Sequence, residues 1–389
     1  MINITDKAKC CGCTACKYIC PNNCIRLDED EEGFLYPKIE TARCINCGLC
    51  EKVCPMLNTR SELLPLGTYA AINEDENIRK KSSSGGVFSL LAEWAIGSGG
   101  VVYGARYNSD WMVITDSIDS LEEIYLFRGS KYMQSNLNDS YLECREILKE
   151  GRLVLFCGTP CQISGLKNYL RCQYDNLITV DFVCHGVPSP RVWRRYLEEL
   201  FPREGDRVIS DINFRDKKNG WKQFRLVIDY IEDGQRNSIA SVYTENIFMR
   251  AFLSDLILRP SCYQCPVKCG RSHADITIGD LWGAEYIVPD MDDNQGISLV
   301  MTNTSKGEEL FKKIPVKEFP IEYIDVCKYN SAIVEASRPH LRRSEFFKGL
   351  EQTKSISESI KYSLRPTFRQ RLSLIRQFIR SLIVVDNKS

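Results

Sequence analysis

The stretches CCGCTACKYICP, residues 10–21, and CINCGLCEKVCP, residues 44–55, decide the first part of this fold. Both follow the pattern C-x2-C-x2-C-x3-C-P. Three cysteines at this spacing wrap a short loop around a 4Fe–4S cluster, whereas the fourth cysteine reaches the cluster of the other half. The repeated motif therefore predicts two clusters that share ligands across the two halves.

The crossed pattern assigns each predicted cluster three cysteines from one half and the last cysteine of the other. The first set is Cys10, Cys13, Cys16 and Cys54, and the second set is Cys44, Cys47, Cys50 and Cys20. Two zinc sites are the alternative, because four-cysteine zinc also uses C-x2-C pairs. The triple C-x2-C-x2-C with a crossed fourth ligand favours clusters. We expect the remaining Cys11 and Cys24 to be small buried side chains beside the loops.

The composition is that of an ordinary globular protein, with 389 residues, 43% hydrophobic and 26% charged. The net charge of zero does not predict a nucleic-acid partner. The start has no secretory pattern and no run of about 18 apolar residues occurs, so we expect a cytoplasmic protein. The nineteen cysteines are odd in number and repeat in spacing, which indicates metal or cluster ligation rather than disulfides.

Between the two halves, the segment RLDEDEEGFLYPKIE predicts a hairpin turn that feeds a strand. We expect its acidic run, residues 28–32, to be a solvated tip. The alternative is a docking surface for a basic redox partner.

The remaining chain predicts a different architecture. Apolar runs such as RLVLF and LITVDFV alternate with helical patterns such as PCQISGLKNYL, which indicates an α/β domain with a mainly parallel core. After about residue 201 the pattern becomes richer in strands. We therefore predict an α+β bacterial ferredoxin-like module over residues 1–58, an α/β domain with a mixed sheet over 66–340, and a helical tail over 341–389.

Three motifs in the second domain carry chemistry. In KSSSGGVFS a helix starts at glycines, which makes either a plain helix cap or a phosphate site. In LFCGTPCQ, Cys161 starts a helix after a buried strand, a position that lowers the pKa of a thiol. Cys184 follows the next strand, so it could face Cys161 at the carboxyl edge of the sheet.

The third motif, CYQCPVKCG, contributes the pair Cys262 and Cys265. Together with Cys161 and Cys184 this pair makes four thiolates, enough for a third cluster. A structural zinc or simply buried cysteines are the alternatives. Cys157 and Cys269 are extra thiols that could replace one of these ligands.

Taken in order, SSGGVFS, RGSKYMQS, GTPCQISGLK, CHGVPSP, CYQCP and DITIGDLWG resemble the coenzyme F420 hydrogenase/dehydrogenase beta-subunit family. With the N-terminal ferredoxin module, the resemblance runs from about residue 5 to about residue 285. It implies FAD and at least one 4Fe–4S cluster in the α/β domain, with Cys161, Cys184, Cys262 and Cys265 as ligands. It also implies that Lys131 stabilises the anionic reduced flavin, the alternative being an exposed lysine.

The flavin-binding residues that this resemblance implies belong to the glycine-rich helix start, the GSKYMQS loop and the turn before Cys161. They are Ser84, Gly85, Gly86, Lys131, Tyr132, Gln134, Ser135, Gly158 and Thr159.

The C-terminal segment predicts a basic amphipathic helix over residues 365–385. Its apolar face consists of Phe368, Leu372, Ile375, Ile379 and Leu382. Such a helix packs on the protein or a partner, or lies on an anionic membrane surface.

The cysteine motifs, together with the FAD and the deazaflavin chemistry that the resemblance implies, predict an iron–sulfur flavoprotein oxidoreductase. Electrons would move between the ferredoxin clusters and FAD, with hydride exchange to an organic acceptor such as a deazaflavin coenzyme. We assign no catalytic acid or base. The partner is either a redox protein or a small-molecule electron acceptor. The alternatives are a non-catalytic electron-transfer adaptor that feeds a partner enzyme and a binding protein with structural metal.

Overall fold

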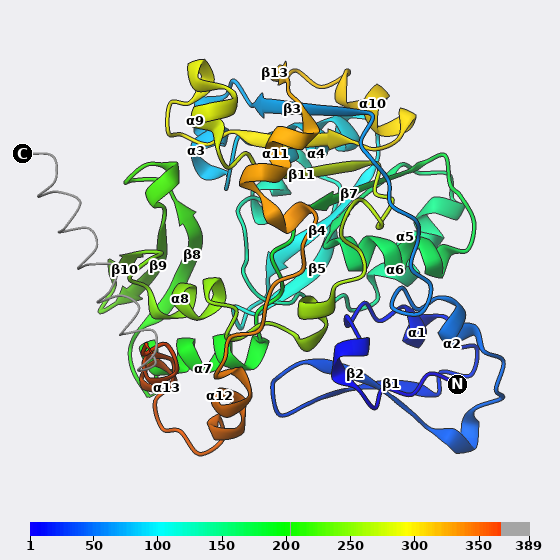
Figure 1. The fold of residues 1–389 in the computed structure, drawn as a ribbon, viewed down its shortest axis with the longest axis horizontal. Helices are drawn as coiled ribbons and strands as arrows, with labels where there is room; N and C mark the ends of the chain where they lie inside the picture. The colour runs from blue at the N-terminus through cyan, green and yellow to red at the C-terminus, as the bar shows by residue number, and fades with distance from the viewer. Residues whose placement is uncertain (203, 367–389) are drawn as a thin grey trace, which may run out of the picture.

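The computed structural model describes residues 1–202 and 204–366 (Figure 1). Within those ranges no helix has the length and apolar character needed to cross a membrane. The apolar face predicted for residues 365–385 lies outside the described residues.

The N-terminal module is a hairpin with two cysteine loops. Strands β1 (Ile25–Glu29) and β2 (Leu35–Ile39) pair antiparallel, as the sequence predicts. Each cysteine loop ends in a single helical turn, α1 (Ala15–Tyr18) or α2 (Leu49–Lys52). Both turns start from a residue in the left-handed region, Thr14 at φ 59° and Gly48 at φ 71°. This sharp entry lets each loop curl back over its own cysteines.

The second region is built on an eight-stranded mixed sheet. Its strand order is β13-β3-β12-β11-β7-β6-β4-β5. The four parallel strands at its centre are β4 (Val101–Tyr107), β6 (Val154–Gly158), β7 (Leu177–Phe182) and β11 (Ile276–Asp280). The antiparallel additions are β3 (Gly67–Ile72), β12 (Ser298–Thr302), β13 (Lys317–Pro320) and β5 (Val113–Ile118).

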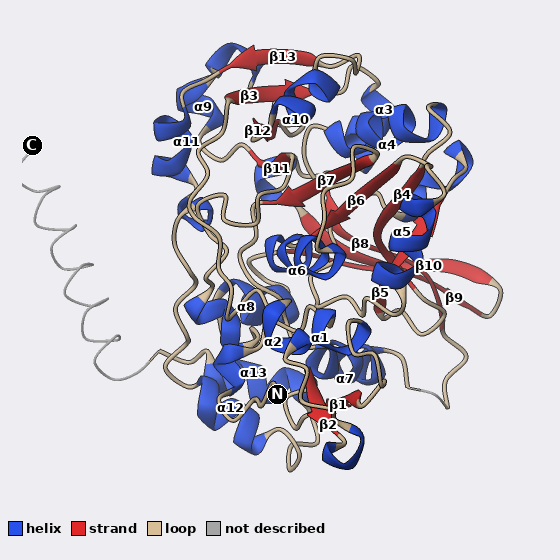
Figure 2. Ribbon diagram, turned by 90° about the vertical axis from the view of Figure 1, so that its right-hand side faces the viewer, coloured by secondary structure: helices blue, strands red, loops and turns tan. Residues whose placement is uncertain are grey.

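Helices cover both faces of this sheet, so its central strands are apolar on both sides. Along β6, Phe156 packs in the core that contains Ile163 of α6 (Pro160–Leu170). The neighbouring Leu155 packs on the opposite face with Leu91 of α4 (Val87–Gly97). Helix α5 (Ser140–Lys149) joins α6 on the first face, and α3 (Glu76–Lys81) and α10 (Ser305–Phe311) lie near β3 and β12 (Figure 2).

The strand-rich pattern after residue 201 forms a separate sheet. Strands β8 (Val208–Asp216), β9 (Arg225–Glu232) and β10 (Gln235–Val242) pair antiparallel. They share an aromatic core with α7 (Pro190–Leu200) and α8 (Ile247–Leu253), in which Trp193, Phe214 and Phe248 are fully buried.

The helices that follow residue 341 are part of this same core. Phe346 of α12 (Arg343–Gly349) and Ile360 of α13 (Ile356–Ser363) are buried against α7 and α8. The described part of the predicted tail is therefore packed rather than a free appendage. The short helices α9 (Ala284–Ile287) and α11 (Tyr323–Tyr329) complete the description.

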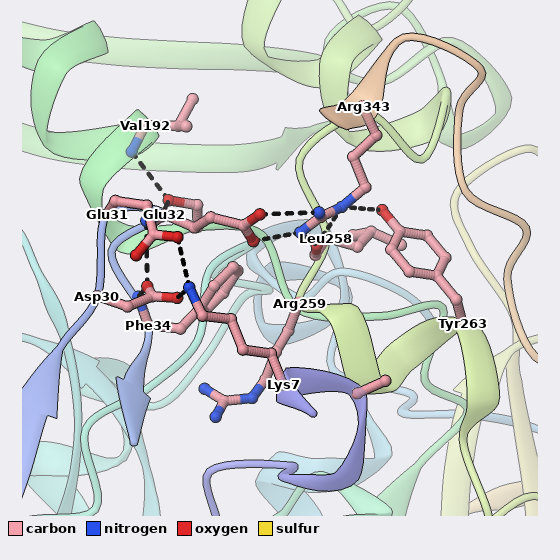
Figure 3. Close-up of polar contacts among 12 residues, drawn as sticks. Lys7, Asp30, Glu31, Glu32, Phe34, Val192, Leu258, Arg259, Tyr263 and Arg343 are labelled. Carbon is pink, nitrogen blue, oxygen red and sulfur yellow. Dashed lines mark hydrogen bonds and ion pairs between the residues drawn. The ribbon is translucent and has the colours of Figure 1, made fainter. Parts of the chain in front are cut away.

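The acidic hairpin tip is docked on the second region through Glu32, which overturns the expected exposure for that side chain, whereas Glu31 is 63% exposed, as expected. Figure 3 shows the Glu32 carboxylate against the Arg343 guanidinium, at 2.5 Å. These side chains are only 12% and 10% exposed. Gly33, at φ +88°, comes so close to α7 that an added Cβ would lie 2.2 Å from Cβ of Arg191. Asp30 and Glu31 both pair with Lys7 inside the module.

We predict that Arg343→Met weakens the contact between the hairpin tip and the second region. Glu32 would keep a nearly buried carboxylate without its counter-charge, which costs about 3 kcal/mol of unfolding free energy. Hydrogen exchange across residues 25–39 should accelerate, and the thermal unfolding midpoint should fall. The control is Lys361→Met, because Lys361 pairs with Glu358 in an exposed position and its loss should change little. Equal effects of the two variants would contradict the prediction.

Candidate functional site

The first predicted cysteine set surrounds one cavity of the N-terminal module. The cavity holds about 380 Å³ of space, and its lining includes Cys10, Cys13, Cys16 and Cys54. The first three come from one cysteine loop and the last from the other. The structure therefore brings together the crossed set that the repeat predicts. Apolar side chains such as Leu27 and Leu35 close the remainder of the wall.

The second set surrounds a cavity of the same size at the other side of the module. Its lining includes Cys20, Cys44, Cys47 and Cys50. Cys47 is exposed and Ile45 is 62% exposed, so this cavity lies at the protein surface. Cys24, expected to be a bystander, is buried in the same lining with its sulfur 3.3 Å from the Cys20 sulfur.

The thiols of each set surround a space instead of meeting at a point. Within the described ranges, no group of three or more His, Cys, Asp or Glu side chains is arranged to hold a single metal ion. Burial raises the pKa of the Cys16 thiol, and the Cys10 and Cys54 thiols raise it further. A bound positive centre would reverse that penalty and stabilise the thiolates.

A third and larger cavity of about 860 Å³ lies where the N-terminal module meets the main sheet. Its lining includes the four cysteines of the predicted third set: Cys161, Cys184, Cys262 and Cys265. Cys161 and Cys184 therefore share one cavity at the carboxyl edge of the parallel strands, as their positions after β6 and β7 predict. The backbone N–H of Val187 donates to the Cys262 sulfur at 3.4 Å.

The expectation that the helix start lowers the pKa of Cys161 is wrong. A hydrogen bond with the Cys11 thiol and burial raise that pKa well above its ordinary value. The two extra thiols, Cys157 and Cys269, differ in position relative to the third cavity. Cys269 lines the third cavity, whereas Cys157 does not, and burial raises the pKa of Cys157 to about 12.

Cys11, which we expected to be only a small buried side chain beside the cysteine loops, contacts the candidate site directly. It lines both the first and the third cavity, as does Met56, so these two side chains separate the cavities. Its thiol interacts with those of Cys13 and Cys161. No spacing rule singles it out, since it is merely the neighbour of Cys10. Its position depends on the packing of the first cysteine loop on α6, where an added Cβ at Gly165 would lie 2.9 Å from Cβ of Cys13.

The predicted flavin residues gather elsewhere on the same edge of the sheet, and none of them lines the three cavities. Ser83 links two of the predicted segments, because Ser130 donates to its Oγ from the backbone N–H (2.6 Å) and from the hydroxyl (2.8 Å). Gly85 packs so closely on β3 that an added Cβ would lie 2.3 Å from the Ala71 carbonyl oxygen. Gly86 starts α4 at φ 88° without a side-chain cap.

Lys131 lies in this group with a largely desolvated ammonium. Its Nζ donates to the carbonyls of Arg128 (3.2 Å) and Gly129 (3.1 Å). Burial lowers its pKa to about 7, so the exposed-lysine alternative is not what the structure shows. The adjacent Tyr132 accepts a hydrogen bond from Arg215, which pairs with Asp280 at 2.7 Å.

Three of the predicted flavin residues are engaged in the protein itself. Thr159 caps α6 in a reciprocal capping box with Gln162. The Gln162 amide also donates to Ser135 at 2.9 Å. Gln134 donates to the Cys11 carbonyl and accepts from Arg259, which places it at the joint with the N-terminal module. The structure thus brings Ser84–Gly86 and Lys131 to the edge, while Gln134 and Ser135 support the loop.

Comparison with known proteins agrees with both regions. Residues 9–57 match the family described as a 4Fe-4S dicluster domain. Residues 151–324 match the family described as the C terminus of the beta subunit of coenzyme F420 hydrogenase/dehydrogenase. No curated protein sequence matches the chain.

Among solved structures, a chain of the F420-reducing NiFe hydrogenase complex from Methanosarcina barkeri, studied by xenon derivatization, is similar to this one. The identity is 18% and the TM-score 0.45, over 69% of this chain and 91% of that chain. The two family matches confirm the resemblance seen in the motifs. Residues 151–324 of this chain are thus similar to the C terminus of coenzyme F420 hydrogenase/dehydrogenase beta subunits, and residues 9–57 are similar to 4Fe-4S dicluster domains.

Proposed function

We propose that this chain is an iron–sulfur flavoprotein oxidoreductase with three 4Fe–4S clusters and one FAD. The observation that carries the proposal is the coincidence of three cavities with three four-cysteine sets. When bound, the clusters supply one-electron transfer, and the flavin couples single electrons to hydride exchange with an organic acceptor of the deazaflavin class.

The protein's own contribution is to hold these groups in series and away from water. The second cavity is open at Cys47, where a redox partner protein has access. The first cavity lies inward and is separated from the third by the Cys11 and Met56 side chains. Cys184 and Cys161 place the third cavity at the same sheet edge as the proposed flavin residues. The order of sites therefore runs from the surface to the centre of the molecule.

The flavin proposal depends on the chemistry of the donors at this edge. The uncapped start of α4 offers backbone N–H groups and the positive end of a helix dipole, which suits a phosphate. Lys131 supplies a cation that the protein has desolvated but has not paired with a carboxylate at hydrogen-bond distance. Gly158 ends β6 beside the capped start of α6, where an added Cβ would lie 3.1 Å from Oε1 of Gln162. These residues fit an anionic dinucleotide.

The adaptor alternative is tested by turnover. An oxidoreductase should reduce a deazaflavin acceptor as the isolated chain when supplied with a one-electron donor. A chain that binds clusters and flavin but turns over no acceptor without a partner would instead be the non-catalytic adaptor.

The crossed ligand sets lead to a prediction about iron content. Cys16→Ala and Cys54→Ala should each remove about four of about twelve irons, and the same EPR signal should disappear in both. The matched control is Cys144→Ala, because Cys144 is fully buried in the sheet core and lines none of the three cavities. Loss of different signals in the two ligand variants would contradict the crossed assignment, and stoichiometric zinc would contradict the clusters.

The third set is tested in the same way with a different control. Cys184→Ala should lower the iron count by about four while leaving the ferredoxin-type signals intact. Cys157→Ala should leave iron unchanged, since Cys157 lies outside the third cavity. Cys269→Ala decides between the two candidate fourth ligands: full iron retention supports Cys265, and loss of the third cluster supports Cys269.

The pKa of Lys131 predicts a pH dependence of flavin binding. The ammonium is protonated below about pH 7, and binding of an anionic dinucleotide would keep the proton in place. The dissociation constant for FAD should therefore be constant below about pH 7 and rise by up to about tenfold per pH unit above it. Lys131→Met should weaken binding and abolish this dependence. Titration by flavin fluorescence measures both, and an unchanged pH profile in the variant would contradict the role of Lys131.

A further inference from the structure

Arg259 is a fully buried arginine at the joint between the N-terminal module and the main domain. Its Nε donates to the Cys10 carbonyl at 2.7 Å, and one terminal nitrogen donates to the Leu35 carbonyl at 2.9 Å. The other terminal nitrogen donates to Oε1 of Gln134 at 2.8 Å. Figure 3 shows its side chain beneath the hairpin tip, close to Phe34.

The aromatic rings and oxygen atoms that contact the guanidinium are all neutral. It stacks over the rings of Tyr36 (4.3 Å) and Phe34 (5.3 Å), and its oxygen partners are carbonyl or amide groups. Among residues 1–202 and 204–366, no carboxylate forms an ion pair with it, since Glu32 pairs with Arg343 instead. A buried charge without a counter-charge is strongly unfavourable. Something else must supply the negative charge.

The negative groups that face Arg259 are cysteine sulfurs. A terminal nitrogen lies 3.5 Å from the Cys10 sulfur in the lining of the first cavity. Burial lowers the pKa of Arg259, but the Cys10 thiolate and, less strongly, the Cys262 thiolate in the lining of the third cavity raise it above its ordinary value. The cation therefore lies between the first and the third cysteine set and finds its counter-charge in both.

The second cysteine set has a different environment. Neutral backbone groups donate to its sulfurs: the N–H of Ile2 to Cys50 at 3.4 Å and the N–H of Cys24 to Cys20 at 3.5 Å. Met1 also lines this cavity, but it is 36% exposed and its ammonium is paired with Glu51 at 3.0 Å. The potential of an iron–sulfur cluster depends on net charge, on hydrogen bonds to its sulfurs and on exposure to solvent. The two ferredoxin-type sites differ in exposure, because the second cavity opens at Cys47. They also differ in charge, because only the first set faces a fully buried guanidinium.

We propose that Arg259 is a positioning residue that raises the reduction potential at the first cysteine set above that at the second. Reduction adds one electron to the cluster, and an external one-electron donor supplies it. A cation beside the cluster stabilises this reduced form. An electron that enters at the exposed second set is thereby drawn inward toward the main domain. This inference rests on the proposed function, namely that both sets hold 4Fe–4S clusters.

The test is an anaerobic redox titration of the full holo-chain, followed by EPR. Signals are assigned to the two sets by their loss in Cys16→Ala and Cys50→Ala. In the native chain the first set should be reduced at a potential at least about 59 mV higher, a tenfold difference in the one-electron equilibrium. Arg259→Met should lower the first potential by at least that amount and leave the second unchanged. Arg259→Lys should retain part of the difference because it keeps the charge.

The control is the double variant Glu32→Met/Arg343→Met, which removes a charge pair from the same joint without changing net charge. It should move neither potential. The inference is overturned if Arg259→Met leaves both potentials in place with its iron bound, or if the control shifts the first potential equally.

The native chain alone provides a second measurement should Arg259→Met fail to fold. Equal potentials at the two sets overturn the inference even if iron is fully bound. Absence of iron and sulfide from the anaerobically purified native chain would instead overturn the proposed function, so the two failures are distinguishable.

Discussion

Two buried arginines hold the N-terminal module on the main domain, and the series of cysteine sites depends on them. Arg343 neutralises the carboxylate of Glu32 at the hairpin tip, while Arg259 binds the backbone of the first cysteine loop and of β2. Both side chains lie at a joint where water is excluded. A long, planar cation with several donors suits such a place, because one side chain can satisfy several carbonyls at once. Within the acidic run, Glu32 thus holds the module on the main domain, while the Glu31 side chain stays exposed.

The joint explains why the first and third cavities are neighbours. The first cysteine loop packs on α6, and the same helix carries Cys161 at its start. The side chains of Cys11 and Met56 then line both cavities and lie between them. Electron transfer requires short distances between centres, and here rigid packing of loop on helix provides that proximity. The hairpin docking at Gly33 and Glu32 prevents the module from rotating away from α6.

Much of the architecture follows from local patterns. The alternation of apolar strands and helical segments predicted the parallel centre of the sheet, and the cysteine spacing predicted which thiols share a cavity. The pattern failed where pairing is long-range. β12, from a segment without a recognised motif, pairs with the preceding strand β11 but also with β3, which lies more than 200 residues earlier in the chain. The helix-start argument for Cys161 failed because burial and the Cys11 thiol outweigh a helix end.

The sequence by itself determined the cysteine sets, the family and the kind of sheet, because these depend on spacing and periodicity along the chain. Tertiary structure alone decided which side chains lie between the sets. Arg259 and Cys10 are brought together only when the hairpin docks, as are Glu32 and Arg343. Because these arginines are buried, solvent does not screen their charges. Burial depends on the packing of the whole molecule and not on the local sequence.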